Sequence, residues 1–190
     1  MKHLARIPII LISGSMGSGK TTLADILMCT AIKDDGISAT KASFATRLKS
    51  IARYMGWNGE KDEKGRKLLQ GLGNIGREYC EDVWVGITAA YIEDQEAELA
   101  VIDDWRFRNE YDYLARNKYF LPIKVRITRP SLRCLYGKVD LDNDISETSL
   151  PTGECYYDTV VKNEGTIEEL ISKADKLYSD IMNRSEIRWE

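Results

Sequence analysis

A glycine-rich stretch near the start of the chain constrains the fold more than any other feature. It spans residues 14–22, GSMGSGKTT, and it directly follows the apolar run IPIILIS at residues 7–13. Apolar residues at helical spacing come next, at Leu23, Ile26 and Leu27. A buried strand, a glycine-rich loop and a helix in this order match the GxxxxGK[ST] phosphate-binding loop and the context that it requires.

The chemistry of this loop explains its residue types. Glycines let backbone N–H groups curl around a β-phosphate, and the N-terminus of the following helix adds a favourable dipole. In this pattern Lys20 reaches the β- and γ-phosphates, and Thr21 holds Mg²⁺ through its hydroxyl. The residues predicted to bind the phosphates are Gly14, Ser15, Met16, Gly17, Ser18, Gly19, Lys20, Thr21 and Thr22.

The rest of the chain alternates between strand and helix patterns. Strands are predicted at residues 38–44, 99–102, 121–127 and 156–161. Helices are predicted at residues 46–55, 67–79, 82–98, 109–117 and 166–182. This alternation is typical of an α/β fold in which helices cover both faces of a mostly parallel sheet of about five strands.

Length and composition favour one domain with inserts. With 190 residues, 43% of them hydrophobic, the chain has material for a single core spanning residues 1–190. Residues 45–98 form a helical region within it. Residues 130–153 are polar and without periodicity, longer than an ordinary connection, and we predict that they form a lid.

Charge and cysteine usage argue against several functional classes. The 27 basic and 30 acidic residues give a net charge of −3, so no global basic field favours nucleic acid or a membrane surface. The longest apolar run falls short of the ~20 residues of a membrane helix. The four cysteines form no CxxC pair, which favours reduced thiols and a cytoplasmic location.

Two acids follow the predicted strand at residues 99–102. They are Asp103 and Asp104. Ligands of open α/β sheets bind beyond the carboxyl ends of the strands, where an acid can order water around magnesium or fix an arginine. We favour Asp104 as the functional acid; the alternative is that both are solvated turn residues.

Four arginines stand near the ends of predicted elements and are candidates for phosphate recognition. They are Arg77, Arg106, Arg129 and Arg133. The planar guanidinium suits bidentate contact with phosphate, although each could equally be a solvated surface residue. A second glycine motif, GLGNIG at residues 71–76, follows KLLQ rather than a buried strand. It therefore predicts an interrupted helix that presents Arg77, and not a dinucleotide site.

Three further blocks carry a resemblance to a known family. The first contains Phe44, Ala45, Leu48 and Lys49; the second Gln70, Gly73, Gly76, Arg77, Asp82 and Trp84; the third Asp104, Arg106, Phe107, Asn109 and Glu110. In this order, together with the phosphate loop, they resemble the bacteriophage deoxynucleoside monophosphate kinases, a branch of the P-loop nucleoside monophosphate kinases.

The resemblance implies a P-loop NTPase fold with three αβα layers and transfer of a phosphoryl group from ATP to a deoxynucleoside monophosphate. It implies Mg²⁺ with ATP as the donor, held by Thr21 and, through water, by Asp104. The catalytic residues that it implies are Lys20, Arg77, Asp104, Arg106, Arg129 and Arg133. The acceptor-binding residues that it implies are Phe44, Lys49, Arg77, Asp82, Trp84, Arg106, Asn109 and Glu110.

The expected partners are therefore ATP and the monophosphate, with no nucleic acid or membrane partner, and the host cytoplasm is the expected location if the chain is phage-encoded. A homodimer is compatible with the sequence. Two other functions stay open at this point. One is a kinase for another phosphorylated metabolite such as phosphomevalonate, and the other is a P-loop ATPase that acts as a switch.

Overall fold

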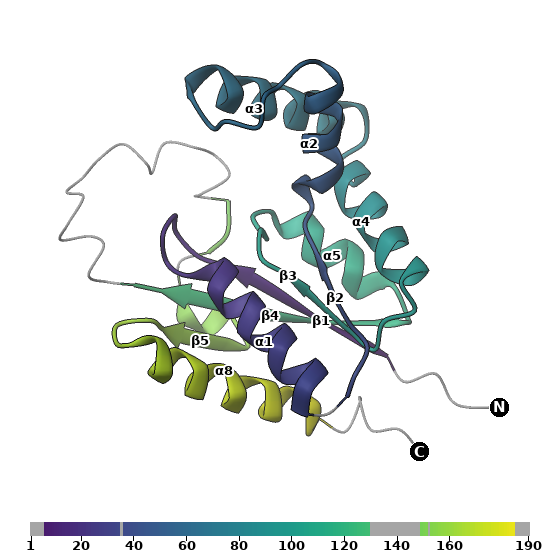
Figure 1. Ribbon diagram of the computed structural model, residues 1–190. Coiled ribbons are helices and arrows are strands. Elements are labelled where there is room, and N and C mark those ends of the chain that lie inside the picture. Colours follow the sequence, from purple (N-terminus) through teal and green to yellow (C-terminus); the bar gives the residue numbers. More distant parts are fainter. Residues whose placement is uncertain (1–5, 35, 130–148, 152, 185–190) are drawn as a thin grey trace.

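A five-stranded parallel sheet with the strand order β2-β3-β1-β4-β5 forms the centre of the structure (Figure 1). The structure is a computed structural model that describes residues 6–34, 36–129, 149–151 and 153–184. The strands are β1 (Ile7–Ser13), β2 (Ala39–Ala42), β3 (Leu99–Ile102), β4 (Phe120–Thr128) and β5 (Thr159–Lys162). The α/β fold class predicted from the sequence is confirmed.

Helices cover both faces of this sheet. They are α1 (Lys20–Asp34), α2 (Ala45–Tyr54), α3 (Glu63–Tyr79), α4 (Val83–Asp94), α5 (Arg108–Arg116) and α8 (Ile167–Met182), and a short 3₁₀ helix η2 covers Glu154–Tyr156. Apolar residues of α1 and α8 pack on one face, and those of α4 and α5 pack on the other. The structure therefore has three layers, with the sheet between two layers of helices.

Strand β1 shows why its sequence is apolar without alternation. Ile10 and Ile12 belong to the core under α1 and α8, whereas Ile9 and Leu11 belong to the core under α4 and α5. All four side chains are fully buried. A central parallel strand is covered on both faces, so both sets of alternating side chains must be apolar.

Helix α3 differs from its prediction at its start and in its continuity. It begins at Glu63 rather than at residue 67, because the Asp62 carboxylate accepts a hydrogen bond from Gly65 N at 2.7 Å and caps the helix. It also runs uninterrupted through the glycine motif. A Cβ at Gly76 would come 2.5 Å from the Trp84 ring, so this glycine is required for close packing of α3 on α4.

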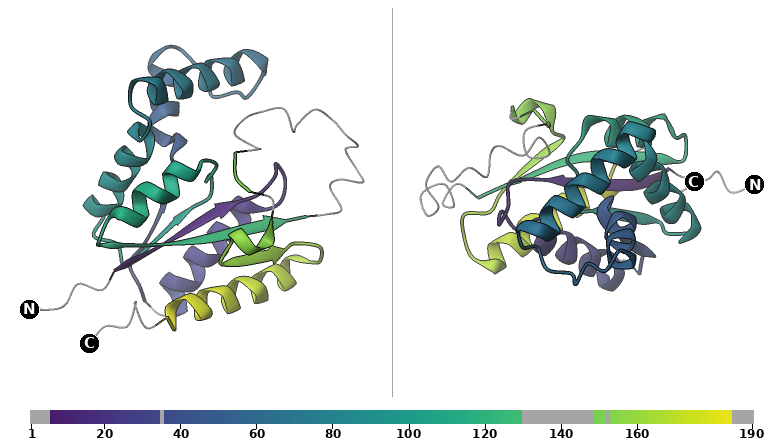
Figure 2. Two further views of the ribbon diagram at one scale, coloured as in Figure 1. Left: turned by 180° about the vertical axis from the view of Figure 1, so that it is seen from behind. Right: turned by 90° about the horizontal axis from the view of Figure 1, so that it is seen from above.

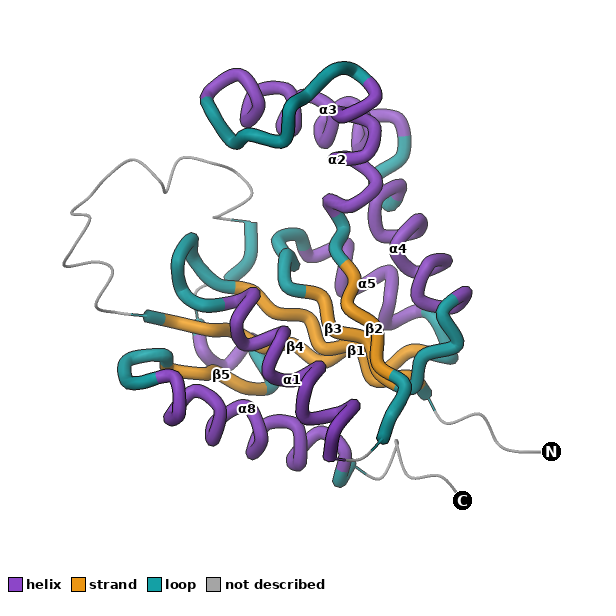
Figure 3. Tube along the Cα trace, in the orientation of Figure 1, coloured by secondary structure: helices purple, strands orange, loops and turns teal. Residues whose placement is uncertain are grey.

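Helices α2 and α3 project from the sheet at the carboxyl ends of the strands (Figures 1 and 2). The loops that follow β1 and β3 lie at the same edge (Figure 3). The predicted lid lies mostly outside the described residues, and Arg133 lies outside them entirely. Within the described part of the chain, no helix combines the length and the apolar character that crossing a membrane requires.

Candidate active site

The glycine-rich loop joins β1 to α1 and has a backbone that only glycines adopt easily. Gly14 and Gly19 have φ angles of +156° and +102°. A Cβ at Gly14 would collide with the Ile127 carbonyl oxygen, and one at Gly19 would lie 2.6 Å from Asn163 Nδ2. Close approach of β4 and β5 to the loop therefore requires glycine at both positions.

Ser18 is fully buried within this loop, and no described residue offers its hydroxyl a hydrogen-bond partner. A buried polar group without a partner is costly, and a bound ligand is one way to satisfy it. Lys20 Nζ donates to the carbonyl oxygens of Gly14 at 2.5 Å and Ser15 at 2.9 Å. The ammonium thus lies across the loop, where a phosphate would meet it.

The loop is tied to the end of β3 by one hydrogen bond between side chains. Thr21 Oγ1 donates to Asp103 Oδ2 at 3.0 Å. Lys41 Nζ, on β2, lies 3.4 Å from the same carboxylate oxygen and 2.7 Å from Asp25 Oδ1. Burial lowers the pKa of Lys41, but the hydrogen bond to Asp25 and the charge of Asp103 outweigh it, so the net shift is upward.

Asp104, the acid favoured from the sequence, faces the start of α2 instead. Its carboxylate accepts hydrogen bonds from Ser43 Oγ at 2.7 Å and from the backbone N–H groups of Phe44 and Ala45 at 3.0 Å each. An anion at a helix N-terminus is favourable. Its carboxylate therefore holds α2 against β3, and Asp103 is the acid that contacts Thr21 of the phosphate loop.

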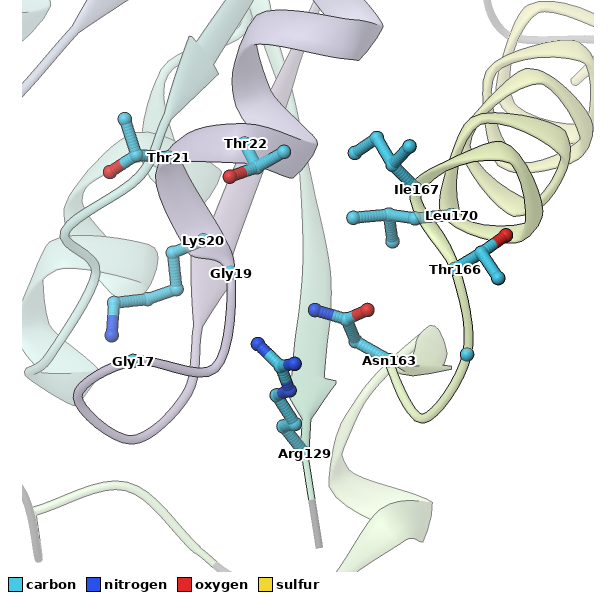
Figure 4. A pocket seen from close by; sticks show the side chains of 11 residues that line it. Gly17, Gly19, Lys20, Thr21, Thr22, Arg129, Asn163, Thr166, Ile167 and Leu170 are labelled. Atoms are coloured by element: carbon cyan, nitrogen blue, oxygen red, sulfur yellow. The ribbon is translucent and has the colours of Figure 1, made fainter. Parts of the chain in front are cut away.

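A pocket of about 470 Å³ opens beside the loop. It is lined by Gly17, Gly19, Lys20, Thr21, Thr22, Arg129, Asn163, Gly165, Thr166, Ile167 and Leu170. Figure 4 shows Arg129 rising from the end of β4 toward Asn163, with residues from the start of α8 forming the far wall. Its size lies within the range of small-molecule sites.

Asn163 follows β5 directly and fixes the phosphate loop from this side. Its Nδ2 donates to Ser18 O at 2.9 Å, and its backbone N–H donates to Thr128 O at 2.8 Å. One side chain thus joins the ends of β4 and β5 to the loop after β1. Asn163 and Lys41 are not among the site residues predicted from the sequence. Asn163 lies just beyond the carboxyl end of the predicted strand at residues 156–161, which is a signal that could have found it, whereas Lys41 lies within the predicted strand at residues 38–44.

The turn after β3 carries Arg106 and is anchored by a buried acid. Glu110 Oε2 accepts hydrogen bonds from the backbone N–H groups of Arg106 and Phe107, both at 2.9 Å. Burial raises the pKa of the Glu110 carboxyl to about 8, the charge of Asp104 raises it further, and the two backbone hydrogen bonds oppose this shift. Glu110 therefore fixes the backbone of the turn that carries Arg106.

Arg77 comes to this turn from α3. Its guanidinium carbon lies 4.4 Å from the centre of the Phe107 ring, and Nη2 donates to Asn74 Oδ1 at 2.7 Å. The structure thus brings Arg77 next to the residue that follows Arg106, although the two arginines are far apart in sequence. Both side chains are partly buried.

Several residues expected at the acceptor take part in packing or in hydrogen bonds within the protein. Phe44 and Trp84 are buried, with 4% and 9% of their surface exposed, and the indole N–H of Trp84 donates to Gly73 O at 3.1 Å. Asn109 Nδ2 donates to Asp82 Oδ1 at 3.1 Å, which ties α5 to the start of α4. Phe44 and Trp84 thus belong to the packed interior, whereas Asp82 and Asn109 are partly buried. Lys49, on α2, is partly buried.

Similar proteins are found among solved structures but not among protein families. No protein-family model matches the sequence, and no curated protein matches it. Among solved structures, the protein APE1195 aligns over 96% of this chain and 100% of its own, with a TM-score of 0.51 and 14% identity. A sugar kinase from a Janibacter species aligns over 93% of this chain and 95% of its own, with a TM-score of 0.50 and 16% identity. The five-stranded parallel sheet with its flanking helices is therefore a fold that this chain shares with these two proteins.

Proposed function

We propose that this chain transfers the γ-phosphoryl group of ATP to the phosphate of a deoxynucleoside 5′-monophosphate and so forms the diphosphate. The observation that carries the proposal is the hydrogen bond between Thr21 and Asp103. It holds the phosphate loop against the turn after β3, and this turn carries Arg106. Two anion-binding elements are thus adjacent, as transfer between two phosphates requires.

The donor side is supported by the pocket beside the phosphate loop. A triphosphate bound by the loop N–H groups has its sugar and base directed along the lining of that pocket, which includes Arg129 and Asn163. The ammonium of Lys20, which lines this pocket, offers a donor to the phosphate oxygens. In this state Lys20 exchanges its two carbonyl partners for phosphate oxygens.

The residues present also fit a magnesium ion. Thr21 supplies a hydroxyl and Asp103 a carboxylate, and Mg²⁺ is usually held by one or two such groups together with substrate phosphates and water. When bound, the ion neutralises charge on the β- and γ-phosphates. The ammonium of Lys41 lies 3.4 Å from Asp103 Oδ2, the oxygen that also accepts the hydrogen bond from Thr21.

The acceptor side is supported by Arg77 and Arg106. A monophosphate is already anionic, so its reaction needs no strong general base, and positioning with charge neutralisation suffices. Guanidinium groups supply both. The choice of a deoxynucleotide as the acceptor rests on the resemblance of the sequence blocks around these arginines.

A coupled assay of ATP consumption over all deoxy- and ribonucleoside monophosphates tests the proposal. We expect turnover with at least one deoxynucleotide, and roughly ten- to hundredfold lower efficiency with its ribonucleotide, since an apolar pocket rejects an added hydroxyl by about a hundredfold at most. Lys20→Ala serves as the inactive control, with turnover reduced at least about a hundredfold.

Three outcomes would contradict the proposal in different ways. Equal efficiency for every matched pair, such as dGMP and GMP, would leave a general nucleoside monophosphate kinase. Phosphorylation of phosphomevalonate and of no nucleotide would favour a metabolite kinase. Release of phosphate to water with no acceptor modified would favour an ATPase switch.

A further inference from the structure

The guanidinium of Arg77 packs beside Phe107, Asn74 and Gly73. The ring of Phe107 lies against its face, 4.4 Å from ring centre to guanidinium carbon, and Asn74 accepts from Nη2 at 2.7 Å. Gly73 has no side chain and so leaves space for this guanidinium. A Cβ at Gly73 would lie 3.3 Å from Nη2 and 3.2 Å from Leu48 Cδ1, so even alanine would require these neighbours to shift by a few tenths of an ångström.

Phe107 is itself held on both sides of its backbone. Its N–H donates to Glu110 at 2.9 Å, and its carbonyl oxygen accepts from Trp105 Nε1 at 2.9 Å. Both partners are buried, with 7% of Glu110 and 2% of Trp105 exposed. The ring therefore projects from a fixed backbone and forms a rigid surface for Arg77.

Stacking suits the chemistry expected of Arg77. An aromatic ring attracts the face of a guanidinium, whereas phosphate is recognised by its N–H edge. Contact with Phe107 can thus persist while a phosphate is bound. A long arginine side chain that is already ordered loses less conformational entropy when its ligand arrives.

We propose that Phe107 is a positioning residue for acceptor binding, because its ring holds the Arg77 guanidinium at the turn that carries Arg106. Arg106 and Phe107 are adjacent in the chain, and Glu110 accepts from the backbone N–H of both. One buried acid therefore fixes the backbone of Arg106 directly and holds the ring that contacts the Arg77 guanidinium. This inference rests on the proposed function.

Two substitutions of Phe107 distinguish the effect of its aromatic face from the effect of its apolar bulk. Phe107→Leu keeps an apolar side chain and removes the aromatic face, whereas Phe107→Tyr keeps the face. We expect Phe107→Leu to raise KM for the monophosphate roughly three- to tenfold, with KM for ATP within about twofold of wild type. Phe107→Tyr is expected to restore both values.

Tyr119→Leu is the matched control. It also removes an aromatic ring that contacts a cation, since Lys118 Nζ lies 4.8 Å from the centre of the Tyr119 ring. Tyr119 lies just before β4, at the amino end of that strand and away from the phosphate loop. We expect this variant to change neither KM.

A double-mutant cycle with Arg77→Met decides whether the ring acts through Arg77. In the Arg77→Met background, Phe107→Leu should reduce kcat/KM for the monophosphate by less than about twofold, because the group that the ring positions is gone. Independent, multiplicative losses would overturn the inference, as would an unchanged acceptor KM in Phe107→Leu. A wild-type chain that phosphorylates no monophosphate would overturn the proposed function, and this inference with it.

Discussion

Thr21 and Asp103 lie 82 residues apart in the sequence and share a hydrogen bond of 3.0 Å between hydroxyl and carboxylate. This contact joins the first turn of α1 to the end of β3. Because β1 and β3 are neighbouring parallel strands, their carboxyl ends meet at one edge of the sheet. The residues that follow them are therefore brought together by topology.

We expect Asp103→Asn to impair the use of magnesium. An amide keeps the size of the side chain and an acceptor for Thr21, but it loses the negative charge that favours the cation. Turnover should fall about 10- to 100-fold, and the Mg²⁺ concentration for half-maximal rate should rise. A magnesium titration at saturating ATP measures this. An unchanged titration midpoint would remove Asp103 from the metal site.

The neighbouring substitution Asp104→Asn should act on stability instead. The side-chain NH2 group of the asparagine would face Ser43 or one of the two backbone N–H groups that now donate to the carboxylate, so a donor would meet a donor. Loss of charge-assisted hydrogen bonds typically costs about 1–3 kcal/mol. Urea unfolding should show this loss, with the magnesium midpoint close to that of wild type. The reverse pattern in the two variants would return the metal role to Asp104.

Asn163→Ala should weaken binding of ATP. The substitution removes the donor to Ser18 O and one wall of the pocket, so the phosphate loop is less ordered before the nucleotide arrives. A neutral hydrogen bond contributes about 1 kcal/mol, which corresponds to a roughly fivefold higher Kd by calorimetry.

Asn183→Ala is the control for that measurement. Asn183 lies at the far end of α8, where its Nδ2 donates to Ser179 Oγ at 3.4 Å. We expect it to leave ATP affinity unchanged. Equal losses in the two variants would indicate a general effect on α8 rather than a contribution of Asn163 to the site.

Glu110 should make stability depend on pH. The ordinary pKa of 4.5 applies in the unfolded chain, and burial raises the pKa to about 8 in the folded state. Between these values the folded protein holds a proton that the unfolded chain has lost. Its contribution is therefore fully present below about pH 4.5 and is lost as pH rises to about 8, by at most ~1.4 kcal/mol per pH unit.

Glu110→Gln tests this sign. The amide is neutral at every pH, and its oxygen can accept from the N–H groups of Arg106 and Phe107. The free energy of unfolding of the variant minus that of wild type should therefore increase between pH 5 and pH 8. Urea titrations at several pH values measure the difference, and parallel pH profiles would show that Glu110 is ionised in the folded state throughout.

The sequence alone was sufficient where the signal is local. The run at residues 7–13 predicts strand β1 with the bounds that the structure has, because a buried central strand must be apolar on both faces and Gly14 ends it. The phosphate loop is equally local, since its glycines, Lys20 and Thr21 act within one turn. The alternation of strands and helices was enough for the fold class.

Packing decided the roles of the aromatic residues and glycines. From the sequence alone, Phe44 and Trp84 could either stack on the base of a nucleotide or lie in the core. The structure buries both side chains. The glycine motif at residues 71–76 is compatible with a turn, but Gly73 and Gly76 make room for Arg77 and Trp84 within a continuous helix. These distinctions depend on neighbours that are distant in sequence.

The choice between Asp103 and Asp104 shows the limit most directly. Both residues are aspartates that directly follow the same strand, so the strand and helix patterns of the sequence do not show which partner each one meets. Because β3 lies between β1 and β2, the residues that follow it can reach the loops after both neighbours. In the folded chain Asp103 contacts Thr21 after β1, and Asp104 contacts Ser43 after β2. The sequence determines that acids stand at this edge, and only the tertiary structure decides which one meets the phosphate loop, because the choice depends on partners that are distant in sequence.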